Sequence, residues 1–105
     1  MKQSAAEVIR WSEAKKPDEA TIREILAEEA LHPYRWSNLP GDVYSPHTHS
    51  YNKVIYVVRG SITFGLPDYG EELALEPGDR LNLPAGVSHR AVVGQEGVTC
   101  LEAHR

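Results

Sequence analysis

The chain has 105 residues and a formal net charge of −4 at neutral pH. This length suits one small domain that buries a single core. We therefore expect one domain over residues 1–105, with a strand and a helix in residues 1–33 and a β-rich part in residues 34–105. No run of Lys or Arg forms the basic face that phosphate neutralisation requires, so nucleic acid is not an expected partner.

No stretch of about eighteen apolar residues could cross a membrane, and the first residues lack the apolar core of a signal peptide. Cys100 is the single cysteine, so no internal disulfide can form. This agrees with a reducing compartment. We expect a soluble, cytoplasmic protein without a membrane partner, in which Cys100 is a buried, inert thiol.

The first third of the chain predicts a short strand and one helix. Residues 8–11 are apolar enough for a strand, and residues 18–31 follow a helical period. Pro17 suits a first helical turn, and the acidic residues after it suit the positive end of the helix dipole. Proline at position 33 ends the helix, because it pushes the residue before it out of the α region.

The apolar stripe of this helix is narrow and consists of Ile22, Ile25 and Leu26. Such a stripe predicts a helix that lies outside a sheet rather than within a core. We expect Leu26→Ala to destabilise the protein by about 2–3 kcal/mol, the low end for core truncations.

Short β-branched and apolar runs separated by Gly and Pro fill the rest of the chain. They predict strands over residues 34–39, 43–44, 53–59, 62–64, 72–75, 80–83, 88–93 and 98–103. Breaks are expected at Gly60-Ser61 and Gly94, among other turns. Many short strands of this kind are typical of a β-sandwich or β-barrel.

Two stretches carry the candidate chemistry. The stretch GDVYSPHTHSYNKVIYVVRG, from Gly41 to Gly60, places His47 and His49 two residues apart. Alternate side chains of a strand share a face, so two such imidazoles can reach one metal ion at about 2.0–2.1 Å per bond. The stretch GDRLNLPAGVSH ends in a third histidine, His89, behind a Pro-Ala-Gly turn.

The spacings of both stretches resemble the two motifs of the cupin superfamily. The first is glycine, five residues, His-x-His, three residues, a further position, six residues and glycine; the second is glycine, five residues, Pro-x-Gly, two residues and histidine. The resemblance implies a mainly β fold, a small jelly-roll β-barrel, with the predicted helix outside it. Lys53 stands where the first motif has a glutamate, and Val93 stands where an asparagine follows the second. That glutamate is usually the fourth protein ligand of the metal.

We expect His47, His49 and His89 together to bind one divalent transition metal. Each histidine alone would be interpreted as an ordinary surface or core residue, but all three at both motif spacings favour a metal site. Three imidazoles leave positions open for water or substrate, and imidazole does not select among Fe, Zn, Mn, Ni and Cu. Within the cupins, three histidines without the glutamate resemble the thiol dioxygenases and the diketone-cleaving dioxygenases, which use ferrous iron.

Two classes of function remain open. The first is a metal-dependent, oxygenase-like enzyme acting on a small organic molecule. The second is a non-enzymatic module in which the barrel holds a small ligand or a metal, since the fold does not determine the function.

Tyr51 and Lys53 share the parity of His47 and His49, so on a regular strand they also point into the barrel. Tyr51 could position a substrate, or simply pack with its hydroxyl at the rim. Charged Lys53 cannot replace a glutamate ligand, because an ammonium has no lone pair. It could deprotonate, extend to the mouth of the barrel, or pair with an anionic substrate.

Large aromatic residues, Trp11, Tyr34 and Trp36, lie ahead of both motifs. Aromatic residues are favoured at protein interfaces, although burial in the core would explain them equally well. We expect a homodimer. The two remaining histidines, His32 and His104, belong to neither motif and receive no role.

Overall fold

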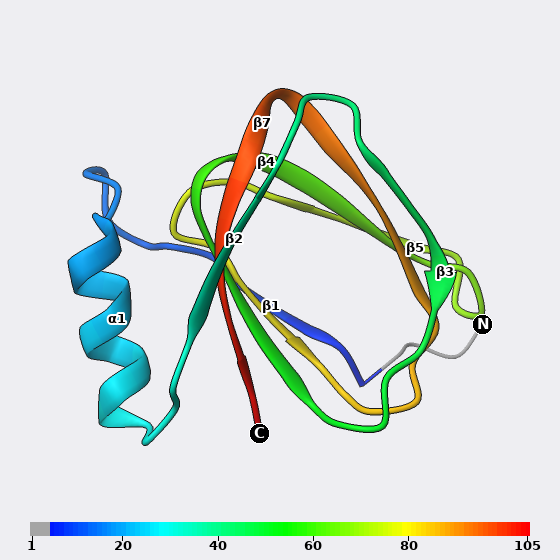
Figure 1. Ribbon diagram of the computed structural model, residues 1–105, viewed down its shortest axis with the longest axis horizontal. Coiled ribbons are helices and arrows are strands. Elements are labelled where there is room, and N and C mark those ends of the chain that lie inside the picture. The colour runs from blue at the N-terminus through cyan, green and yellow to red at the C-terminus, as the bar shows by residue number, and fades with distance from the viewer. Residues whose placement is uncertain (1–4) are drawn as a thin grey trace.

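A computed structural model describes residues 5–105, which form one helix and a seven-stranded antiparallel sheet (Figure 1). The elements are β1 (Glu7–Ile9), α1 (Glu19–Glu28), β2 (Tyr34–Asn38), β3 (Val43–His47), β4 (Lys53–Leu66), β5 (Glu71–Leu75), β6 (Arg80–Leu83) and β7 (His89–His104). The predicted mainly β architecture with one helix is confirmed. Within the described residues, no helix is both long enough and apolar enough to span a bilayer.

The two long strands, β4 and β7, organise the whole sheet. The hydrogen-bonded order is β1-β6-β4-β7-β2, with β5 also paired to β4 and β3 also paired to β7. The first half of β4 pairs with β6 and with the end of β7, whereas its second half pairs with β5 and with the start of β7. Both halves of the sheet therefore share β4 and β7. Figure 1 shows the two halves meeting at an angle where β7 bends.

The strands predicted over residues 53–59 and 62–64 are one strand, and so are those over 88–93 and 98–103. The expected break at Gly60-Ser61 was wrong: the β4–β7 register shifts between Gly60 and Ile62 while the pairing continues. Gly60 has a φ of +76°, and a Cβ atom there would lie 1.9 Å from the carbonyl oxygen of Gly97. Only glycine allows this backbone conformation at so close an approach, so the glycine marks a bend rather than a turn.

The first strand is also shifted from its predicted position. β1 covers Glu7–Ile9 and pairs with β6, so Trp11 lies beyond the strand. The backbone N–H of Trp11 donates to Oδ1 of the buried Asp79 at 3.1 Å, and the indole donates to the carbonyl of Lys15 at 2.9 Å. These contacts hold the side chain against its own chain.

The sheet separates two apolar clusters. Alternation along β4 sends Ile55 and Val57 into the interior between the sheet halves, and sends Val54 and Tyr56 to the face that carries α1. The outer cluster consists of Ile22, Leu26, Leu31, Val54, Tyr56, Leu101 and Ala103. As predicted, α1 therefore packs outside the sheet (Figure 1). Both Ile22 and Leu26 are fully buried there, whereas Ile25 is half-buried.

The helix ends three residues earlier than predicted. Asp18 caps its first turn by accepting a hydrogen bond from the backbone N–H of Thr21 at 2.8 Å. At the other end Ala30 has a φ of +59°, and the N–H of Leu31 donates to the carbonyl of Leu26 at 2.9 Å. This is a Schellman cap with alanine where glycine is usual, so the sequence contained no stop signal before His32-Pro33.

Candidate metal centre

The three motif histidines come from two segments that meet through strand pairing. His47 is the last residue of β3, His89 is the first residue of β7, and the two are Cα partners in the sheet. His49 lies two residues beyond β3, in the loop before β4. Its carbonyl accepts a hydrogen bond from the N–H of Gly86 at 2.9 Å, which ties this loop to the predicted Pro-Ala-Gly turn.

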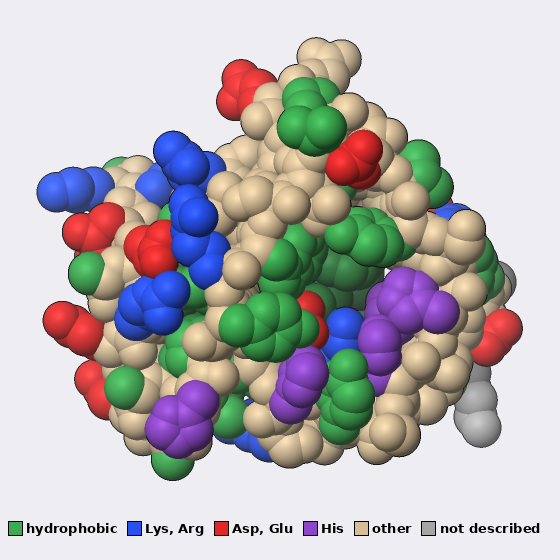
Figure 2. All heavy atoms as spheres, in the orientation of Figure 1, with side chains coloured by type: hydrophobic (Ala, Val, Ile, Leu, Met, Phe, Trp, Pro, Cys, Tyr) green, Lys and Arg blue, Asp and Glu red, His purple; other side chains and the backbone are tan. Residues whose placement is uncertain are grey.

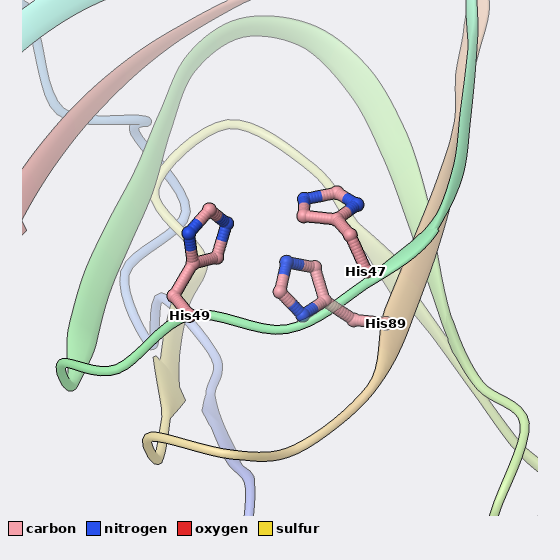
Figure 3. A group of neighbouring side chains, drawn as sticks. All are labelled: His47, His49 and His89. Atoms are coloured by element: carbon pink, nitrogen blue, oxygen red, sulfur yellow. The ribbon is translucent and has the colours of Figure 1, made fainter.

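The three imidazole rings converge on one space (Figure 3). Their centroids are separated by 4.9 Å for His47 and His49, 4.3 Å for His47 and His89, and 5.3 Å for His49 and His89. One ring nitrogen from each lies within 4.8 Å of the other two. Nitrogens on a common ion at about 2.0–2.1 Å per bond are at most about 4.2 Å apart, so small ring rotations close the remaining gap. The predicted three-histidine cluster is therefore present and positioned for a transition metal.

Each of the three rings has a hydrogen-bond partner at Nδ1. The Nδ1 atom lies 2.7 Å from the carbonyl oxygen of Ser45 in His47, and 3.0 Å from that of Val87 in His89. In His49 it lies 3.1 Å from the hydroxyl of Tyr51. A carbonyl partner requires the proton on Nδ1, which leaves the Nε2 lone pair free for a metal.

The Nε2 atom of His49 is buried and has no hydrogen-bond partner among the described residues. A buried polar nitrogen without a partner costs free energy, and a metal ion at this position would satisfy it. Burial lowers the pKa of His49 and of His89; the charge of Lys53 lowers both further, and in His89 these effects outweigh the Val87 hydrogen bond, which raises the pKa. Both rings are therefore held in the neutral form that can bind a metal. The donor set and its protonation fit a divalent transition metal.

The histidines lie at one side of a cavity of about 280 Å³. Its polar lining consists of His47, His49, His89, Lys53 and Glu102. The remaining lining is mostly aromatic or aliphatic: Tyr34, Trp36, Tyr44, Ile55, Ile62, Phe64 and Ala91. Figure 2 shows this hollow facing the viewer, with histidine, basic and acidic side chains inside an apolar rim. A volume near 300 Å³ is at the small end for ligand pockets.

Lys53 lines the cavity and forms an ion pair with Glu102. The Nζ atom lies 3.3 Å from Oε2 of Glu102, and the side chains are only 11% and 3% exposed. This partner differs from the three alternatives considered from the sequence, because it belongs to the chain itself. The register explains the meeting: in the β4–β7 pair, Lys53 is opposite His104 and Ile55 is opposite Glu102.

Three further donors surround the Glu102 carboxylate. The hydroxyl of Tyr34 donates at 2.5 Å, the indole of Trp36 at 3.2 Å, and Nε2 of His104 lies 3.0 Å away. Burial alone raises the pKa of Glu102, but the Tyr34 hydrogen bond and the Lys53 charge outweigh it and lower the pKa. Burial and this carboxylate raise the pKa of Tyr34 well above its usual range, so its hydroxyl stays a donor. Glu102 is therefore a buried carboxylate in its charged form.

Sequence reasoning missed this cluster. Glu102 is a charged residue within the apolar run of residues 98–103, which was the available signal, but the register of the last strand could not be assigned. Tyr34 and Trp36, for which a dimer contact and burial in the core were both considered, donate hydrogen bonds to Glu102. His104 received no role, yet it contacts Glu102 and stacks on Tyr51 with ring centroids 4.0 Å apart.

The structure also shows the surroundings of Tyr51 and Cys100. Tyr51 is half-buried and bonded to His49, but it does not line the cavity. Cys100 is fully buried, and burial raises the pKa of its thiol far above the usual range. The prediction of a buried, unreactive thiol agrees with this environment.

Comparison with known proteins then settles the family. The family model described as Cupin domain matches residues 34–103, which is most of the chain. The chain belongs to the cupin superfamily. The predicted cupin identity is thus confirmed, and the curved antiparallel sheet with its outer helix fits the cupin jelly roll.

Individual relatives and solved structures share all or part of this fold. It is 34% identical over 59 residues to acireductone dioxygenase from Danio rerio; the match covers 53% of this chain and 33% of the relative, so the cupin matches only about a third of that protein's length. A DUF861 family protein from Thermotoga maritima superposes with a TM-score of 0.66 at 19% identity, over 95% of this chain and 99% of the other. The polyketide cyclase RemF from Streptomyces resistomycificus gives a TM-score of 0.61 at 28% identity, over 70% of this chain and 54% of the other.

Proposed function

We propose that this cupin binds one divalent transition metal through His47, His49 and His89 and acts as an oxygenase-like enzyme on a small organic molecule. The observation that carries the proposal is the convergence of three imidazoles whose Nδ1 atoms are all engaged. Such second contacts are typical of metal-ligating histidines, because they orient the ring and select the tautomer.

A metal held by three protein ligands keeps positions for substrate or water, and it would supply Lewis acidity or one-electron chemistry there. The protein contributes a small, mostly apolar cavity that limits water and admits only a small molecule. Iron is the metal we favour, since the similarity to acireductone dioxygenase supports dioxygenase-like chemistry.

Lys53 and Tyr51 are the proposed supporting residues. An ammonium carries three donors, and Glu102 takes only one of them, so Lys53 can still donate to an oxygen of a ligand in the cavity. A carboxylate or enolate would suit this position. Tyr51 acts through His49, whose ring it orients by the hydrogen bond at Nδ1.

The second candidate function is a module that holds a small ligand or metal without turnover. The small size of the cavity keeps it open, since the cupin fold by itself does not determine function. The discriminating experiment is an oxygen electrode. Iron-loaded protein should consume oxygen with at least one member of a panel of thiols, diketones and phenols, whereas a binding module should consume none with any of them.

Metal content tests the site itself. Purified or reconstituted protein should carry close to one transition-metal ion per chain by elemental analysis, and His49→Ala should lose it, because it removes one of only three protein ligands. His32→Ala is the matched control, since His32 is exposed and outside the cluster. A wild-type protein that stays metal-free with iron, zinc, copper, nickel and manganese would refute the proposal.

We also propose a homodimer in the cytoplasm. Exposed apolar side chains on the β2–β3 side of the sheet, Leu39, Val43, Tyr44 and Val92, support a self-association surface. The single buried thiol suits a reducing compartment. Light scattering after size exclusion tests the assembly, and a monomer at tens of micromolar would contradict it.

A further inference from the structure

The basic residue in the metal cavity raises an electrostatic question. Lys53 stands at the position where the cupin motif has an acidic ligand, and it lines the same cavity as the three histidines. Neutral imidazoles bring no negative charge to balance a divalent cation. An unpaired ammonium nearby would repel that cation, and the low dielectric of a buried site would strengthen the repulsion.

The structure contains a matching negative charge one strand away. Glu102 lies on β7, faces the same cavity and holds Lys53 at 3.3 Å. Among the described residues that line the cavity, Lys53 and Glu102 are the only Lys, Arg, Asp or Glu side chains. Together they have no net charge, so a cation at the histidines meets a dipole instead of a bare ammonium.

Glu102 is anchored and cannot easily leave Lys53. Tyr34, Trp36 and His104 supply three further hydrogen-bond contacts to its oxygens, and the side chain is 3% exposed. A carboxylate with this many partners is fixed in both position and charge. Its negative charge therefore stays beside Lys53.

We propose that Glu102 is a positioning residue that neutralises Lys53 and thereby allows a three-histidine site to hold a divalent cation without an acidic ligand. The cupin motif places a glutamate on the metal. In this chain a carboxylate on the neighbouring strand, Glu102, balances the charge of Lys53 without binding the metal. This inference rests on the proposed metal site, and its test is metal affinity rather than turnover.

The experiment measures affinity for Zn²⁺ and Co²⁺ by competition with a chelating dye. The proteins are wild type, Lys53→Met, Glu102→Gln and the double variant. Glu102→Gln should weaken binding by about tenfold or more, because it leaves the Lys53 ammonium unpaired in the cavity. The double variant should return to within about threefold of wild type because its site is again neutral, and Lys53→Met alone should bind most tightly because it leaves a net negative charge.

Arg23→Gln is the control, because it removes a positive charge on α1 that pairs with Glu19, outside the cavity. It should leave both affinities unchanged. Circular dichroism and thermal melting check that each variant is folded. Should Glu102→Gln fail to fold, the comparison of Lys53→Met with wild type carries the test: Lys53→Met should bind at least about tenfold more tightly, and equal binding would overturn the inference.

Two results would overturn the inference. In the first, wild type binds metal and Glu102→Gln binds it equally well. In the second, the double variant is no closer to wild type than Glu102→Gln is, so that the loss reflects a disturbed fold and not an unbalanced charge. A wild-type protein without metal affinity would remove the inference together with the proposed function.

Discussion

Leu26→Ala tests the docking of α1 on the outer face of the sheet. Leu26 is fully buried and shares its cluster with Val54 and Leu101, from the two long strands. The sequence alone suggested about 2–3 kcal/mol, because an outer helix was expected to bury less. Complete burial raises the expected loss of unfolding free energy.

The magnitude follows from two contributions. Truncating leucine to alanine removes three carbon atoms, which at about 0.8 kcal/mol per buried methylene is roughly 2.4 kcal/mol of transfer free energy. A residual cavity of about 40 Å³ at roughly 24 cal/mol per Å³ contributes about 1 kcal/mol more. We expect a total of about 3–4 kcal/mol, which is a large fraction of the stability of a domain of this size.

Guanidinium denaturation followed by tryptophan fluorescence measures the change. Glu24→Ala, at an exposed position of the same helix, should stay within about 0.5 kcal/mol of wild type. Metal affinity should not change in either variant, because Leu26 packs on the opposite face of the sheet from the cavity. A loss below about 1 kcal/mol for Leu26→Ala would refute the packing argument, since truncating a fully buried leucine destabilises a protein by more than that.

Three further outcomes are expected. The pKa of Glu29 is lowered to about 2, chiefly by hydrogen bonds from the buried Arg80. The contribution of Glu29 to stability is therefore present above about pH 4.5 and is lost as the pH falls toward 2. Glu29→Gln should flatten the pH dependence of the denaturation midpoint in this window, and an unchanged profile would contradict this expectation. Gly60→Ala should destabilise by more than about 2 kcal/mol in the same denaturation assay, because a Cβ would collide with the Gly97 carbonyl; near-wild-type stability would mean that the bend can relax. Tyr51→Phe should weaken Zn²⁺ binding by about tenfold in dye competition by releasing Nδ1 of His49, and equal affinity would show that the hydroxyl does not orient the ring.

The sequence by itself determined the features that depend on neighbours along the chain. The Pro-Ala-Gly turn before His89 was predictable from its residues. The spacings of His47, His49 and His89 match the cupin motifs, and the metal site was predicted from that resemblance. The position of α1 and its apolar stripe were also predictable from local periodicity, although Pro17 was expected in the first turn and the helix begins at Glu19, after the Asp18 cap. Local periodicity and turn chemistry act over a few residues, and a single sequence displays them directly.

Only the tertiary structure decided which distant residues meet. Whether Gly60 ends a strand or bends it depends on the β7 backbone passing beside it, and the Schellman cap at Ala30 depends on Leu31 packing under the helix. The pairing of Lys53 with Glu102 arises from the register between β4 and β7, whose paired residues lie about 25 to 50 positions apart. Shifting that register by one residue would turn Glu102 to the other face of the sheet, and it is set by packing of the whole sheet, which no local pattern encodes.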